Sequence, residues 1–175
     1  MSAQTVANSL ALAGPPSPPG NAMGTIGWIH IIFGSLALFF GLIVVTLPKG
    51  TRLHRTVGHL YFSAMIGLNL TALSLYRLFK TVGPFHILAL VSLGYVLTGV
   101  WYAIRQTPRQ TWLSKHIRFM SWSYVGLLAA ATAEIACRIP GTNFWLAVLI
   151  PSCLVSVLGW YIIENKAVVL KTQLP

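Results

Sequence analysis

The sequence predicts an all-α integral membrane protein, a bundle of five transmembrane helices with the N-terminus outside and the C-terminus in the cytoplasm. Of its 175 residues, 55% are hydrophobic and only 8% are charged, whereas about a quarter of a soluble domain is charged. Five apolar segments reach the length of about 20 residues that a helix needs to cross the hydrocarbon core. Basic residues gather in the short connections between these segments, which is typical of membrane proteins.

The predicted spans form one domain, residues 25–165, and in chain order they cover residues 25–47, 57–75, 84–104, 117–137 and 144–163. The first span stops at Pro48. The third starts at Pro84, since proline is favoured at the first helical position. Arg138 and Pro140 close the fourth span, and Pro151 predicts a kink in the fifth.

The flanking and connecting residues predict the orientation. Residues 1–24 contain no Lys or Arg and are rich in Pro and small residues, which predicts a disordered extracytoplasmic tail. Residues 166–175 form a short basic tail, predicted to be cytoplasmic. In this orientation nine basic residues lie inside and three outside, as the positive-inside rule favours. The nine are Lys49, Arg52, Arg55, Arg105, Arg109, Lys115, Arg118, Lys166 and Lys171.

Several functions are disfavoured by what the sequence lacks. The net charge of +10 does not indicate a nucleic-acid partner, because no basic cluster with interleaved aromatics lies on a soluble face. Membrane lipids are the predicted partner instead. No phosphate loop, G-x-S-x-G elbow, H-E-x-x-H motif or pair of close carboxylates occurs, so no catalytic residues are predicted. Cys137 and Cys153 form no metal or redox motif and are predicted to be small buried hydrophobes.

Histidines are distributed over the predicted helices at two depths. His30 in the first span and His86 in the third lie near the outer face, whereas His59 in the second and His116 in the fourth lie near the inner face. A haem iron with two axial imidazoles takes one from each side of the porphyrin, and facing helices of a bundle supply them. The four histidines are therefore candidate ligands of b-type haem.

A stripe of small residues surrounds His30. Gly27, Gly34 and Gly41 recur every seven residues, and His30 and Ala37 share their face of the helix. Small residues at this spacing let another surface approach closely, so His30 is predicted to face the bundle interior. The stripe is equally typical of a plain glycine packing seam with a hydrogen-bonded histidine beside it.

The inner ligand has an alternative. His54 and His59 are five residues apart and project about 140° apart on a helix, so both cannot face one haem. His54 lies in the basic connection, where a histidine also meets lipid phosphate or water. His116 lies at a span boundary, where the same alternative applies.

Glu134 is the only acidic residue within a predicted span. Together with Arg138, it is a candidate to relay protons or to hydrogen-bond and orient an outer histidine that binds a metal. The four-residue spacing from Glu134 to Arg138 favours a helix ion pair over the relay. Asn69 and Thr71 are predicted to form hydrogen bonds between helices.

Three segments carry a family resemblance: KGTRLHRTVGHLY from Lys49, GPFHILALVSL from Gly83, and KHIRFMSWSYVGLLAAATAEIACR from Lys115. With them the chain resembles the domain of unknown function 2306 family of predicted membrane proteins over roughly residues 26–163. The resemblance implies a multi-span protein of the bacterial inner (plasma) membrane and implies no activity. It points to His54, His86 and His116, with His30 in the first span. It places His59 where many relatives have another residue, which favours His54.

Three functions remain as hypotheses. The first is a small redox protein that holds b-type haem and exchanges electrons with quinone or a respiratory complex. The second is a non-enzymatic accessory or assembly subunit that binds copper or no metal. The third, a small transporter or proton conductor using Glu134, ranks last because transporters usually show repeats or broken helices.

Overall fold

The structure, a computed structural model, describes residues 24–75 and 84–172 and is all-α over these ranges. Its helices are α2 (Thr25–Thr46), α3 (Arg52–Ser74), α4 (Pro84–Arg105), α5 (Trp112–Ala136) and α6 (Phe144–Thr172). The predicted all-α class is confirmed. Residues 1–23 of the predicted tail, together with Arg77 and Lys80, lie outside the described residues.

Four of the helices are long and apolar enough to cross a membrane. They are α2, residues 85–105 of α4, α5, and residues 144–165 of α6. The described residues of α3 do not meet this criterion. This helix also carries Arg52, His54, Arg55 and His59 in its first eight positions. The four spans nevertheless lie within or close to the bounds that hydropathy predicts.

Side-chain capping marks the starts of α3 and α6. α3 starts at Arg52, because the Thr51 side chain accepts a hydrogen bond from the His54 backbone N–H at 3.1 Å. The helix therefore begins five residues before the predicted span. Asn143 caps α6 in the same way and accepts from the backbone N–H of Trp145 at 3.0 Å. α6 continues through Pro151 and beyond the predicted span to Thr172.

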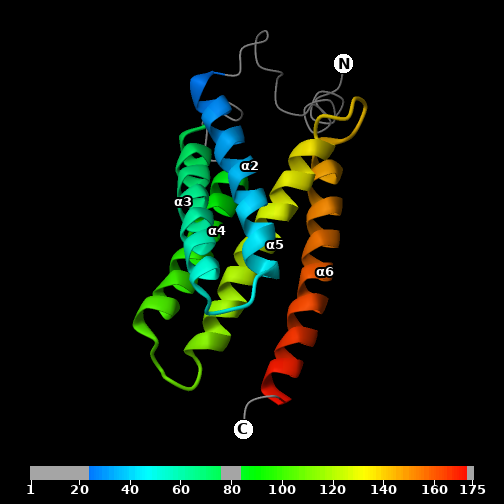
Figure 1. Ribbon diagram of the computed structural model, residues 1–175. Coiled ribbons are helices and arrows are strands. Elements are labelled where there is room, and N and C mark those ends of the chain that lie inside the picture. Colours follow the sequence, from blue (N-terminus) through cyan, green and yellow to red (C-terminus); the bar gives the residue numbers. More distant parts are fainter. Residues whose placement is uncertain (1–23, 76–83, 173–175) are drawn as a thin grey trace, which may run out of the picture.

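Helices α2, α3, α4 and α5 form a closed ring. Each contacts its neighbour in the order α2–α3–α4–α5–α2. α6 packs along α5 and also contacts the start of α4, where Phe144 meets Phe85. Successive helices run in opposite directions, so α2 and α4 start at one end of the bundle and α3 and α5 at the other (Figure 1). Within the described ranges, the backbone of α2 does not come close to that of α4, nor the backbone of α3 to that of α5, although the Tyr61 side chain of α3 reaches Ser123 and Tyr124 of α5. These two pairs are the diagonals of the ring.

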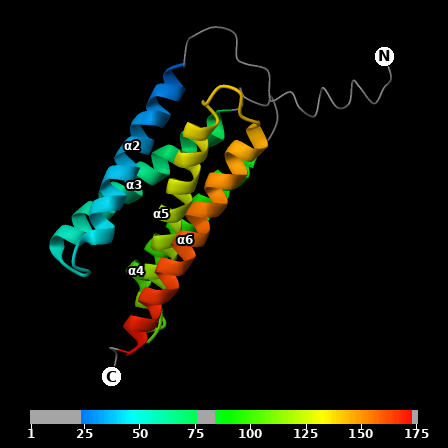
Figure 2. The ribbon, with the colours of Figure 1, turned by 90° about the vertical axis from the view of Figure 1, so that its right-hand side faces the viewer.

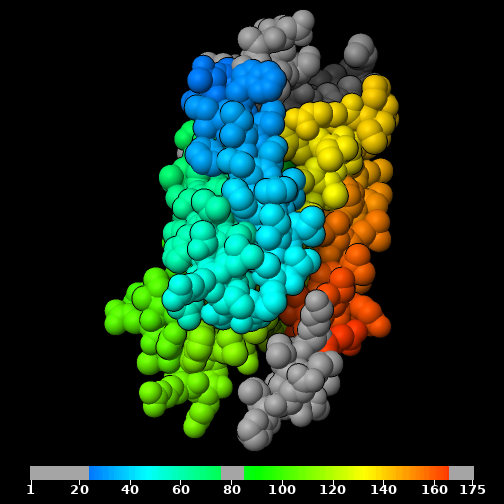
Figure 3. Space-filling model, viewed as in Figure 1, coloured from blue at the N-terminus to red at the C-terminus, as the bar shows by residue number. Residues whose placement is uncertain are grey.

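The whole bundle consists of the α2–α3 hairpin, which packs against a layer formed by α4, α5 and α6 (Figure 2). Side chains of α2 meet those of α5 on the face seen in Figure 3, and Tyr124 of α5 reaches Gly41 and the Leu38 carbonyl in the C-terminal half of α2. Large apolar side chains cover the outside of the layer, with Ile104 74% and Leu154 66% exposed. Such outward apolar surface is expected where lipid, and not water, surrounds the helices.

The ring interior is tightly filled at mid-height. The core side chains are Ala37, Tyr61, Ala64, Met65, Val96 and Leu127, none more than 6% exposed. The buried Tyr61 hydroxyl donates to Ser123 Oγ at 2.9 Å, and Ser123 donates to the Met120 carbonyl at 2.8 Å. Both polar groups are therefore satisfied inside the bundle, which a buried hydroxyl requires.

Gly41 marks the closest approach of α2 to its neighbours. A Cβ atom added there would clash with the Tyr124 ring of α5 and lie 3.0 Å from Cε2 of Tyr61 in α3. Ala37, one turn earlier, is fully buried. The prediction that the seven-residue stripe of α2 faces the bundle is confirmed.

We predict that Gly41→Ala destabilises the bundle by about 1–3 kcal/mol, because the methyl group overpacks the contact with two tyrosine rings. Thermal unfolding of the purified protein in detergent measures the effect. Gly94→Ala is the matched control, since a Cβ there meets nothing within 4 Å, and it should leave stability within about 1 kcal/mol. Equal melting temperatures for the two variants would contradict this account.

Candidate functional site

His30 joins α2 to α3 through its ring. Its Nδ1 lies 3.0 Å from Thr71 Oγ1. The single hydroxyl proton of Thr71 is donated within α3, to the carbonyl of Gly67 at 2.8 Å or Leu68 at 2.9 Å. Thr71 therefore accepts from the Nδ1–H of His30, and Nε2 carries the lone pair. The predicted interhelical role of Thr71 is confirmed, whereas the Asn69 amide donates to Met65 in its own helix.

Glu134 lies at the same end of the bundle, on α5. Its Oε1 is 2.7 Å from Nη2 of Arg138, so the helix pair that the four-residue spacing favours is present. The carboxylate also acts electrostatically on His30 across the α2–α5 contact. Glu134, the only acidic residue of the α5 span, therefore pairs with Arg138 and also has an electrostatic effect on His30.

His86 is the third residue of α4 and is only 5% exposed. Because α2 and α4 start at the same end of the bundle, His86 and His30 lie at similar depths on a diagonal of the ring. The adjacent Phe85 packs edge-on against Phe144 of α6, with ring centroids 6.3 Å apart. Through this contact the start of α4 packs against the start of α6.

His116 occupies the opposite end of the ring. Its Nδ1 donates to the backbone carbonyl of Gly99 in α4 at 2.8 Å, because a carbonyl oxygen can only accept. A Cβ on Gly99 would lie 2.6 Å from Sδ of Met120, so α4 and α5 are in close contact here. The hydrogen bond fixes the ring of His116 and leaves Nε2 with the lone pair.

The two alternative inner histidines differ in burial and in their neighbours. His54 is half-buried and interacts electrostatically with His116 across the ring. His59 is exposed, and its Nδ1 donates to the Arg55 carbonyl of its own helix at 2.7 Å. His54 and His116 therefore lie at the same end of the bundle and interact electrostatically, whereas His59 is on the outer surface.

Burial lowers the pKa of His54 below its ordinary value of 6.5. The nearby charges of Lys49 and His116 lower it further, against a smaller opposing effect of the Val44 carbonyl. The neutral imidazole is therefore the favoured form in the folded protein. A neutral ring is also the form that can coordinate a metal.

Two features of this end were not predicted from the sequence. Arg118 Nη2 lies 2.9 Å from Glu164 Oε1 and links α5 to α6. The only available signal was that Glu164 is one of two acidic residues in the chain. The second feature is a groove of about 480 Å³ on α4, lined by Leu97, Thr98, Trp101 and Tyr102.

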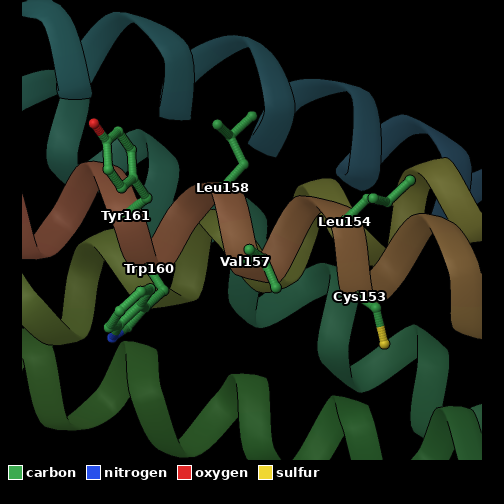
Figure 4. A pocket seen from close by; sticks show the side chains of 6 residues that line it. All are labelled: Cys153, Leu154, Val157, Leu158, Trp160 and Tyr161. Atoms are coloured by element: carbon green, nitrogen blue, oxygen red, sulfur yellow. The ribbon is translucent and has the colours of Figure 1, made fainter.

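A further groove of about 400 Å³ runs along α6. The side chains that line it point to two sides of the helix: Cys153, Val157 and Trp160 to one side, and Leu154, Leu158 and Tyr161 to the other (Figure 4). The prediction that both cysteines are buried is wrong for Cys153, which is exposed on this face. Apolar positions that face lipid cannot be separated by hydropathy from positions that face other helices.

Among the described residues, no group of three or more His, Cys, Asp or Glu side chains is close enough to hold a metal ion. A pair of axial imidazoles is what a b-type haem takes from the protein, since the porphyrin supplies the other four nitrogens.

We predict that the folded bundle loses stability on acidification below about pH 6.5 through His54. Its pKa is lower in the folded than in the unfolded chain, so the unfolded chain binds more protons as the pH falls. The melting temperature in detergent should fall between pH 7 and pH 5, and His54→Gln should flatten this fall. An equally steep fall in the variant would rule out His54 as the source.

A family model described as predicted membrane protein (DUF2306) matches residues 27–168. The match extends from the start of α2 into the last turns of α6 and so includes all five described helices. Neither the curated proteins nor the solved structures contain a protein that matches the chain. The chain belongs to the DUF2306 family of predicted membrane proteins.

Proposed function

We propose that this protein is a membrane electron carrier that holds b-type haem between histidines of diagonal helices. The observation that carries the proposal is the placement of two histidine pairs at opposite ends of one ring. His30 and His86 lie on the α2/α4 diagonal, and His54 and His116 lie on the α3/α5 diagonal. Facing helices of a bundle are the usual source of two axial ligands for one iron.

The proposal requires α3 to be a fifth membrane span. Its 23 residues extend about 34 Å at 1.5 Å per residue, enough to cross the hydrocarbon core. α2 and α4 flank it, and the buried polar groups of Tyr61 and Asn69 are bonded inside the bundle. The basic connections 47–51 and 106–111 then lie on the cytoplasmic side of a bacterial inner membrane, with the N-terminus outside.

The dimensions of the ring are compatible with axial coordination across it. Neighbouring helix axes about 8–10 Å apart place diagonal axes roughly 11–14 Å apart. Two imidazoles that reach inward from diagonal helices therefore meet near the ring axis. Long side chains reach across this distance: Tyr61 of α3 bonds to Ser123 of α5 at 2.9 Å, and Tyr61 and Met65 fill the ring at mid-height.

The orientation of the histidines also supports the proposal. His30 and His116 each donate Nδ1–H to an acceptor on a neighbouring helix, namely Thr71 Oγ1 and the Gly99 carbonyl. Such bonds fix the tautomer and ring orientation of ligating histidines and leave Nε2 for the metal. His54 replaces His59 as the inner candidate because His59 is exposed and bonded to its own helix.

When bound, haem supplies reversible one-electron redox chemistry. The residues of the chain hold and orient the axial imidazoles, and the apolar core between the two levels excludes water. Quinone or a respiratory complex as electron partner is part of this proposal. Three alternatives stay predictions: copper in place of haem, an accessory or assembly role, and proton conduction through Glu134.

We expect membranes that contain the overexpressed protein to show a reduced-minus-oxidised haem b spectrum. His30→Ala or His86→Ala should remove about half of the signal, because each breaks one of two axial pairs. His54→Ala or His116→Ala should remove the other half. Absorbance is normalised to the amount of folded protein in detergent, measured by size-exclusion chromatography.

His59→Ala is the matched control, since it removes an imidazole from α3 without touching the ring interior. It should keep the full spectrum. A colourless wild-type protein would refute the proposal. A loss of signal in His59→Ala equal to that in His54→Ala would refute the assignment of the inner ligand.

A further inference from the structure

The groove on α4 lies close to the C-terminal end of that helix. Leu97, Thr98, Trp101 and Tyr102 line it, and its volume is about 480 Å³. Trp101 is 55% exposed and Leu97 is 47% exposed, so the groove opens to the outside of the bundle. One helical turn separates Leu97 from Trp101, and the groove therefore extends from the end of α4 toward the middle of the span.

Two cations lie over the aromatic rings of the groove. The guanidinium Cζ of Arg105 is 4.6 Å from the centroid of the Trp101 ring, and Nζ of Lys115 is 5.0 Å from that of Tyr102. The Tyr102 ring is itself stacked on Phe119 of α5, with centroids 5.9 Å apart. The charges are thus held at the end of the span, where lipid headgroups lie.

Neither cation is neutralised by a carboxylate side chain of the chain. The sequence contains only two acidic residues. Glu134 is bound to Arg138 at the other end of the bundle, and Glu164 is bound to Arg118. Arg105 and Lys115 therefore present two positive charges beside an aromatic and apolar surface.

We propose that this groove is a binding site for an anionic phospholipid. Its phosphate pairs with Arg105 and Lys115, and the start of an acyl chain lies on Trp101 and Leu97. Charge selects this occupant: a zwitterionic headgroup brings a cation that the two basic side chains repel. A second copy of this chain is a poor occupant, because its two carboxylates are already paired.

The test uses the full-length protein in nanodiscs of phosphatidylcholine that contain a small fraction of lipid brominated on its acyl chains. Bromine quenches tryptophan fluorescence at contact, and Trp101 is one of six tryptophans. Brominated phosphatidylglycerol should quench more than brominated phosphatidylcholine at the same mole fraction. This excess should disappear in Trp101→Phe, which keeps an aromatic ring in the groove.

The double variant R105Q/K115Q should also lose the excess quenching. Each basic residue near an anionic lipid contributes roughly fivefold to affinity, so the pair contributes about 25-fold. The matched control is R52Q/R55Q, which removes two charges at the same end of the bundle but on α3. It should retain the excess.

Two results would overturn the proposal. One is excess quenching that persists in Trp101→Phe, which would place the lipid elsewhere. The other is an equal loss in R105Q/K115Q and R52Q/R55Q, which would indicate diffuse attraction to the basic surface. Monodisperse size-exclusion profiles for all variants establish that they are folded.

Discussion

The close contact of α2 with α3 and α5 at Gly41 is the constraint on which the ring depends. Lipid tails are as apolar as the helix surfaces, so helices in a bilayer associate through close packing of small residues. Ala37 and Gly41 supply this surface, and Tyr61 and Tyr124 fill it from the two neighbouring helices. Because His30 lies seven residues before Ala37, the contact that closes the ring also turns His30 inward.

The scarcity of acids shapes the rest of the electrostatics. Glu134 of α5 forms an ion pair with Arg138, just beyond the end of that helix, and Glu164 of α6 forms one with Arg118 in the first turns of α5. Both ion pairs therefore include a residue of α5, and this helix also contacts α2, α4 and α6. The remaining described basic residues cluster at the end that carries the α2–α3 and α4–α5 connections. The same distribution of charge supports both the proposed orientation of the chain and the proposed site for anionic lipid.

Much of the fold was predictable from hydropathy, since apolar runs of this length have few alternatives to membrane helices. The inward face of α2 was predictable too, because its small residues repeat every seven positions. The choice between His54 and His59 was not predictable. Their 140° separation excludes that both face one site, but which of them faces α5 depends on tertiary contacts that no local pattern records. The exposure of Cys153 was not predicted, for the same reason.

The histidines that support the proposed function are fixed by packing between helices and not by their own helices. His30 donates to α3, and His116 donates to α4 at Gly99, where the absence of a side chain lets Met120 approach. His59, by contrast, donates within α3 and would keep that bond if the bundle opened. An imidazole held from a neighbouring helix has its tautomer set only when the bundle is assembled. In this chain the geometry needed for coordination is therefore a property of the closed ring, and any change that separates α2 from α3 or α4 from α5 releases it.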